Sequence, residues 1–82
     1  MIMGYHSINV PKGTYGELDK IQEEFTELKD AYNMEDKILM ICECSDLYGA
    51  LEGFVEKHFG LTMEDLKKFS NKTKSAFKEG KR

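Results

Sequence analysis

Two acidic residues interrupt the most apolar stretch of the chain, ILMICECSDLY at positions 38–48. Glu43 and Asp46 stand three positions apart there, so on a helix their carboxylates share one face. An ionised carboxylate costs several kcal/mol to bury unless a positive charge meets it, and no Lys or Arg lies between Lys37 and Lys57. A divalent cation would supply that charge. The stretch therefore predicts a buried helix that carries a metal site.

This helix is predicted to span residues 34–58, with Gly60 ending it in the left-handed conformation that glycine favours. Its apolar residues lie on more than one face, which is typical of a central, buried helix. At about 1.5 Å per residue it would be near 37 Å long, too long for the rest of an 82-residue chain to cover. We therefore expect a second copy of the chain to cover it, in a homodimer or homotetramer.

Two further helices are predicted on either side. The first spans 14–31: Thr14 and Glu17 have capping-box spacing, and apolar residues follow at helical intervals, namely Leu18, Ile21, Phe25, Leu28 and Tyr32. Asn33 is expected to cap the central helix. The third spans 63–79, after a second capping box at Thr62 and Asp65.

Residues 1–13 are expected to be irregular, because Gly4, Pro11 and Gly13 interrupt any regular element. The predicted fold is all-α. It is a single domain over 1–82, a helical bundle of two long helices plus a third C-terminal helix, completed by oligomerisation.

A second acidic burst, Glu23-Glu24-x-x-Glu27, lies in the predicted helix 14–31. Glu24 and Glu27 share a flank of that helix, while Glu23 points nearly opposite the apolar stripe. With the pair on the central helix, Glu24 and Glu27 would supply oxygen ligands from two antiparallel helices. Mg²⁺ and Mn²⁺ favour such ligands.

Histidine is not expected in this site. The absence of a Glu-x-x-His pair argues against a di-iron bundle, and His6 and His58 are expected to be surface or packing residues. Cys42 and Cys44 point apart on a helix and are expected to be free core thiols.

The two motifs together resemble the EExxE…ExxD signature of the MazG-like all-α nucleoside triphosphate pyrophosphohydrolase superfamily. Here a 15-residue gap separates Glu27 from Glu43. The segments EEFTELKDA and ECSDLYGAL are also similar to phosphoribosyl-ATP pyrophosphohydrolase, and the resemblance covers residues 14–78. It implies an enzyme that uses Mg²⁺, with Mn²⁺ as a substitute, to hydrolyse an NTP or dNTP to a monophosphate and pyrophosphate.

The resemblance also implies roles for individual residues. The metal ligands would be Glu24, Glu27, Glu43 and Asp46. Glu23 would complete the catalytic group, by holding a second metal or orienting the attacking water. Substrate phosphates would contact the following helix at Lys68, Asn71, Lys74 and Lys78. Members of this superfamily form dimers or tetramers.

Composition limits the other functions. A net charge of −3 gives no general attraction to nucleic acid, although most basic residues gather in 57–82. Neither a signal peptide nor an apolar run of about 20 residues is present, so we expect a cytoplasmic protein without membrane contact.

Three alternatives stay open beside the triphosphate hydrolase: phosphoribosyl-ATP hydrolysis, a non-catalytic oligomeric helical adaptor and, last, nucleic-acid binding through the lysine-rich third helix. Aromatic residues could stack on a base, although core packing is the commoner role; they are Tyr15, Phe25, Tyr32, Tyr48 and Phe54. His6 and Asn9 could reach a base edge if the N-terminal residues fold over the site.

Overall fold

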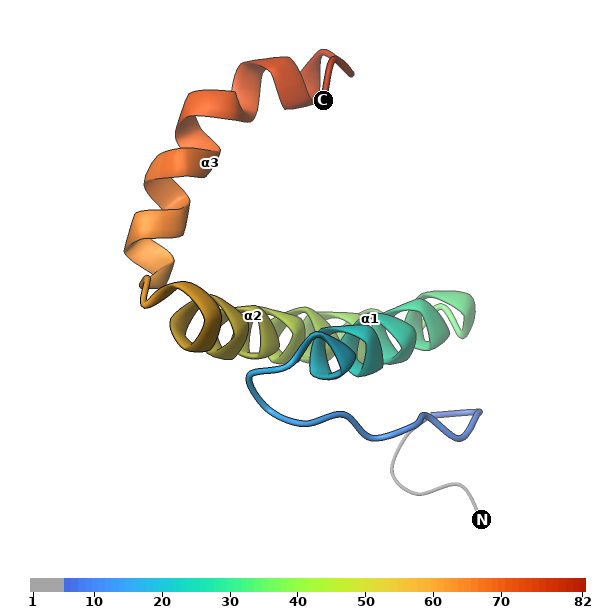
Figure 1. Cartoon of the computed structure of the whole chain (residues 1–82). Coiled ribbons are helices and arrows are strands. Elements are labelled where there is room, and N and C mark those ends of the chain that lie inside the picture. Colours follow the sequence, from blue (N-terminus) through green and yellow to red (C-terminus); the bar gives the residue numbers. More distant parts are fainter. Residues whose placement is uncertain (1–5) are drawn as a thin grey trace.

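The computed structural model describes residues 6–82 and contains three helices, α1 (Leu18–Asn33), α2 (Lys37–Phe59) and α3 (Met63–Lys78). α1 and α2 lie side by side as a helical hairpin, and α3 turns away from them (Figure 1). The predicted all-α class and the three helices are therefore confirmed. No helix in the described part of the chain is long and apolar enough to cross a bilayer.

A tight turn joins α1 to α2. Glu35 adopts a left-handed conformation with φ of 58°, and its N–H donates to the carbonyl of Tyr32 at 3.0 Å. The N–H of Asp36 donates to the carbonyl of Ala31 at 3.1 Å. These two bonds form a Schellman motif, in which Glu35 occupies the position that glycine usually takes.

Two predicted helix starts were a few residues early. α1 begins at Leu18, and its N-cap, Glu17, makes no side-chain cap. The carbonyl of Thr14 instead accepts from the N–H of Glu17 in a turn before the helix. Asp36, not Asn33, caps α2, because α1 continues through Asn33 and its C-terminal turn separates the helices.

The predicted signals at the end of α2 and the start of α3 are confirmed. Gly60 ends α2 with a φ of 66°. Thr62 and Asp65 form the capping box: the Thr62 side chain accepts from the N–H of Asp65 at 3.2 Å, and the Asp65 carboxylate accepts from the N–H of Thr62 at 3.0 Å.

The apolar core of a single chain is small. Its buried apolar residues are Ala31, Leu39, Ala50 and Val55, and no large side chain of the described residues is fully buried. A core this small is too thin for an independent domain of this length.

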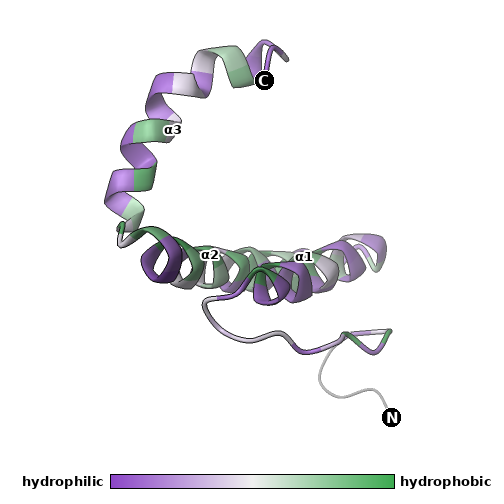
Figure 2. Ribbon diagram, in the orientation of Figure 1, coloured by the Kyte–Doolittle hydropathy of each residue, from purple (hydrophilic) through white to green (hydrophobic). Residues whose placement is uncertain are grey.

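In the single chain, α2 is not buried on all sides. Ile38 is 81% exposed and Ile41 72% exposed, although α2 is the most hydrophobic helix (Figure 2). α1 likewise leaves much of its apolar stripe exposed, including Phe25 and Tyr32. The sequence predicts that a second copy of the chain covers α2; within one chain, α1 turns a mainly polar face to it.

The start of α1 is tied to the end of α2. A Cβ built on Gly53 would lie 2.5 Å from the ring of Tyr15, so only glycine lets the Tyr15 ring lie this close to α2. Glu17 pairs with Lys57 at 2.6 Å and with His58 at 3.1 Å. These contacts fix the direction in which the N-terminal residues approach the hairpin.

Candidate metal site

The hairpin brings four carboxylates together between its helices. Glu24 and Glu27 of α1 and Glu43 and Asp46 of α2 each offer an oxygen, and these oxygens all lie within 4.8 Å of one another. Glu24 and Glu43 are buried, Glu27 is half-buried and Asp46 is exposed. These four residues are named the acidic cluster below. They are the four that the sequence singled out as metal ligands.

Two oxygens of the acidic cluster, Glu24 Oε1 and Glu43 Oε2, are buried without a hydrogen-bond partner among residues 6–82. Glu24 and Glu43 are each only 5% exposed. Because a buried acceptor left without a partner is costly, the arrangement calls for a positive group between the helices. An oxygen-rich donor set of this kind fits Mg²⁺ or Mn²⁺.

The pKa values of two residues in the acidic cluster also reflect the closeness of several negative charges. Burial, together with the adjacent Glu27 carboxylate, raises the pKa of Glu24 to about 7. Burial and the Glu43 carboxylate raise the pKa of Glu27. Both shifts show that full ionisation of the acidic cluster is unfavourable without a counter-charge.

A lysine and a histidine from outside α2 approach the acidic cluster. Lys20 lies one turn before Glu24 on α1, with its Nζ 3.3 Å from Glu24 Oε2. His6 reaches the opposite end of the acidic cluster. Lys20 and His6 are far from Glu43 and Asp46 along the chain, so the spacing of residues within α2 gave no sign of either.

Glu23 is buried but lies outside the acidic cluster. Its carboxylate accepts from the N–H of Gly13 at 2.7 Å, and it pairs with Lys20 at 3.1 Å and Lys12 at 3.6 Å. Burial alone would raise the pKa of Glu23, but these contacts lower it. Glu23 therefore anchors one end of the N-terminal segment, defined as residues 6–16.

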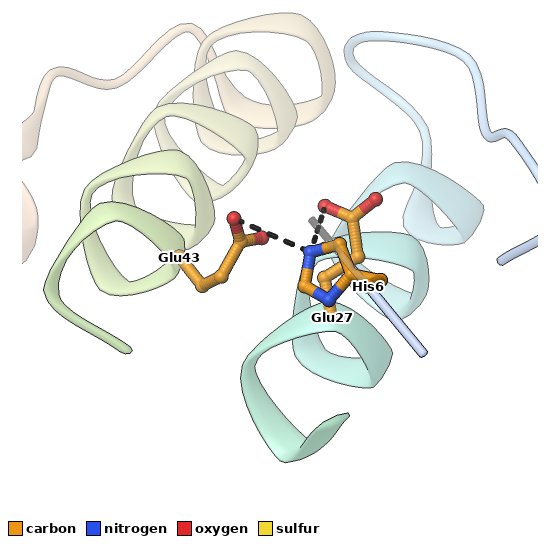
Figure 3. A group of neighbouring side chains, drawn as sticks. All are labelled: His6, Glu27 and Glu43. Carbon is orange, nitrogen blue, oxygen red and sulfur yellow. Dashed lines mark ion pairs between the residues drawn. The ribbon is translucent and has the colours of Figure 1, made fainter. Parts of the chain in front are cut away.

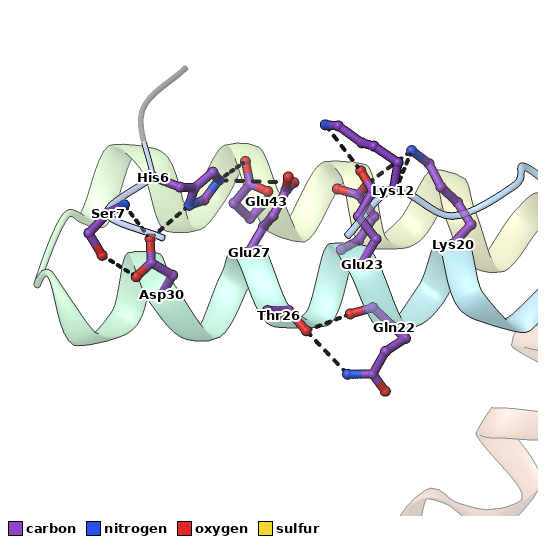
Figure 4. Close-up of polar contacts among 11 residues, drawn as sticks. His6, Ser7, Lys12, Lys20, Gln22, Glu23, Thr26, Glu27, Asp30 and Glu43 are labelled. Atoms are coloured by element: carbon purple, nitrogen blue, oxygen red, sulfur yellow. Dashed lines mark hydrogen bonds and ion pairs between the residues drawn. The ribbon is translucent and has the colours of Figure 1, made fainter. Parts of the chain in front are cut away.

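Asp30 anchors the other end of the N-terminal segment (Figure 4). Its carboxylate accepts from the N–H of Ser7 at 2.9 Å and from the Ser7 hydroxyl, and His6 Nδ1 lies 3.1 Å away. The Ser7 hydroxyl bond is the main cause of a lowered pKa of Asp30.

His6 thereby projects into the site, and its assignment to the surface or to packing was wrong. His6 Nε2 lies 3.5 Å from Glu43 Oε1 and 3.9 Å from Glu27 Oε2 (Figure 3). No local spacing relates His6 to either residue. The sequence did contain a signal for Asp30 as a residue of the site, because Asp30 stands three residues after Glu27 and so lies on the same helix face.

The N-terminal segment also encloses a cavity of about 120 Å³ against α1, lined by His6, Ile8, Asn9, Val10, Lys12 and Glu27. The condition for a role of His6 and Asn9, that the N-terminal residues fold over the site, is thus met. Glu27 belongs to both the cavity and the acidic cluster.

The four predicted phosphate contacts are not part of this site in a single chain. Lys68, Asn71, Lys74 and Lys78 are exposed on α3, which departs from the hairpin after Gly60 (Figure 1). The prediction placed them by position along the chain, and the turn at Gly60 carries the helix away.

The remaining sequence expectations have mixed outcomes. Cys42 and Cys44 are free, as predicted, but exposed rather than in the core. His58 is exposed, as expected. Most of the aromatic residues considered for base stacking are exposed rather than in the core; these are Tyr15, Phe25, Tyr32 and Tyr48. Only Phe54 is half-buried, with its ring centroid 4.5 Å from that of His58.

Comparison with known proteins finds no match to this chain among family models, curated proteins or solved structures.

Proposed function

We propose that this protein is a Mg²⁺-dependent hydrolase that converts a nucleoside triphosphate, NTP or dNTP, to a nucleoside monophosphate and pyrophosphate. The observation that carries the proposal is the acidic cluster, four convergent carboxylates with two buried oxygens that lack partners. The resemblance of the EExxE…ExxD pattern to MazG-like pyrophosphohydrolases supplies the reaction.

The residues of the site have different roles in the proposed reaction. The acidic cluster holds the ion, which when bound would offset the charge of substrate phosphate oxygens. Glu27 also borders the cavity, so a substrate in the cavity would lie next to the ion, and a carboxylate of the site would accept a proton from the attacking water. The ion pair of Glu23 with Lys12 and the hydrogen bond it accepts from the N–H of Gly13 hold the N-terminal segment beside α1, and so set the shape of the cavity.

A second copy of the chain is part of the proposal, as a homodimer or homotetramer. The described part of one chain buries four apolar residues and leaves large ones exposed, including Ile38, Ile41 and Tyr48 on α2. Covering this surface would complete a helical bundle. Such an assembly is also the means by which the α3 side chains Lys68 and Lys74 could approach the acidic cluster of a partner.

A pyrophosphate-release screen tests the reaction. Wild-type protein is incubated with Mg²⁺ and each NTP, each dNTP and phosphoribosyl-ATP. We expect turnover of at least one triphosphate. Asp46→Asn should reduce it by two orders of magnitude or more while leaving the helical circular dichroism unchanged, because Asp46 is exposed. The matched control is Glu52→Gln, an exposed acidic residue on α2 outside the acidic cluster.

Two results would count against this function. Turnover of phosphoribosyl-ATP alone would select the alternative substrate, phosphoribosyl-ATP. No turnover of any nucleotide, with no effect of Mg²⁺ or Mn²⁺ on the melting temperature, would favour the non-catalytic adaptor. The exposed apolar residues of α2 would serve that role equally well. A ligand that binds only the folded state must raise its melting temperature.

A further inference from the structure

The hydrogen bonds of Asp30 determine how His6 presents its ring. An ionised carboxylate can only accept hydrogen bonds, so the contact at 3.1 Å places a proton on His6 Nδ1. In a neutral imidazole the other nitrogen, Nε2, then carries a lone pair. This nitrogen points toward Glu27 and Glu43 (Figure 3).

The distances around His6 Nε2 do not fit a direct hydrogen bond. It lies 3.5 Å from Glu43 Oε1 and 3.9 Å from Glu27 Oε2, whereas an N–H···O bond spans about 2.7–3.2 Å. Two ligands that each lie about 2.1 Å from an ion can be at most about 4.2 Å apart. Both separations are within this limit, so they allow His6 to share a cation with Glu43 and with Glu27.

The burial of these side chains supports the same position. The Glu43 side chain is 7% exposed and the His6 side chain 10% exposed, and Glu43 Oε2 is buried without a hydrogen-bond partner. The group His6, Glu27 and Glu43 also has the ligand-atom spacing of a metal site, and it shares Glu27 and Glu43 with the acidic cluster.

We infer that His6 Nε2, Glu27 and Glu43 form a second divalent-cation position, which binds a transition ion rather than Mg²⁺. Imidazole nitrogen is the ligand that favours transition ions over Mg²⁺. Asp30 is the positioning residue, since a carboxylate that accepts from the other ring nitrogen orients a metal-bound histidine. The inference rests on the proposed function only in that both ions would share Glu27 and Glu43, as neighbouring ions commonly do.

Direct detection of nitrogen at the ion tests the inference. Untagged protein is loaded with Mn²⁺, and electron spin-echo modulation is measured for coupling to ¹⁴N; Co²⁺ titration followed by visible absorption gives stoichiometry and affinity. We expect ¹⁴N coupling and two Co²⁺ per chain in the wild type. His6→Gln should lose the coupling and one equivalent, and Asp30→Asn should weaken that equivalent about 10–100-fold. His58→Gln, the other histidine, should change nothing.

Wild-type protein without ¹⁴N coupling, or His6→Gln with unchanged stoichiometry, would overturn the inference. The histidine would then be a cationic partner of the carboxylates. The two proposals fail separately. Nucleotide hydrolysis with Mg²⁺ but without ¹⁴N coupling would contradict only the cation position that contains His6. Coupling to ¹⁴N without hydrolysis would contradict only the proposed reaction.

Discussion

Replacing Glu24 by glutamine should stabilise the metal-free protein at alkaline pH. Glu24 is 5% exposed, and burial with the nearby Glu27 carboxylate raises its pKa from 4.5 to about 7. A carboxyl group whose pKa is higher in the folded state destabilises that state when ionised. Its unfavourable contribution therefore grows as pH rises from about 4.5 to about 7, and is complete above that.

The size of the effect follows from the two pKa values. Their difference corresponds to about 3 kcal/mol at pH 8. Glutamine keeps the shape and removes the charge, and the attraction of Lys20 is already contained in the raised pKa; its buried amide, however, must find hydrogen-bond partners, which costs about 1 kcal/mol where one is left without. The expected net gain for Glu24→Gln at pH 8 is about 2 kcal/mol, or roughly 8–16 °C in melting temperature for a domain of this size.

Thermal melts in EDTA at pH 5, 6, 7 and 8 measure this difference. The gap between Glu24→Gln and wild type should be near zero at pH 5 and widen through pH 7. Glu52→Gln, which removes an exposed charge on α2, should show no such widening. Added Mg²⁺ should close the gap at pH 8 by stabilising only the wild type, and act less at pH 5, where protons compete with the ion. A gap that does not vary with pH would refute the assignment of uncompensated charge to Glu24.

Three further changes test the fold. Glu35→Gly should raise the free energy of unfolding by about 1 kcal/mol, because it relieves a left-handed conformation, whereas Glu35→Ala should bring no gain; equal urea midpoints for the two variants would contradict this. Gly53→Ala should cost about 1–3 kcal/mol through its clash with the Tyr15 ring, and in a Tyr15→Ala background it should become neutral or stabilising, as urea melts of the four proteins would show. Ile41→Lys places a charge on the exposed apolar surface of α2 and, if the proposed homo-oligomer forms through this surface, should shift sedimentation velocity toward the monomer; a wild type that already sediments as a monomer would contradict the proposed assembly.

Local signals in the sequence determined where α2 ends, where α3 begins and which face of the hairpin is acidic. The capping box at Thr62 and Asp65 and the glycine at position 60 act within a few residues, so they could be recognised without knowing the fold. The three-residue spacing of Glu24 with Glu27, and of Glu43 with Asp46, likewise places each pair on one helix face. An antiparallel hairpin then brings the two pairs together.

Only the tertiary structure decided what surrounds those carboxylates. His6 reaches Glu43 because the N-terminal segment folds back along α1 and is held there by Glu23 and Asp30. α1 turns its acidic flank, rather than its apolar stripe, to α2. Helical periodicity shows which residues share a face but not which neighbour that face will meet. That choice depends on contacts between distant segments, whose free energies no local pattern records.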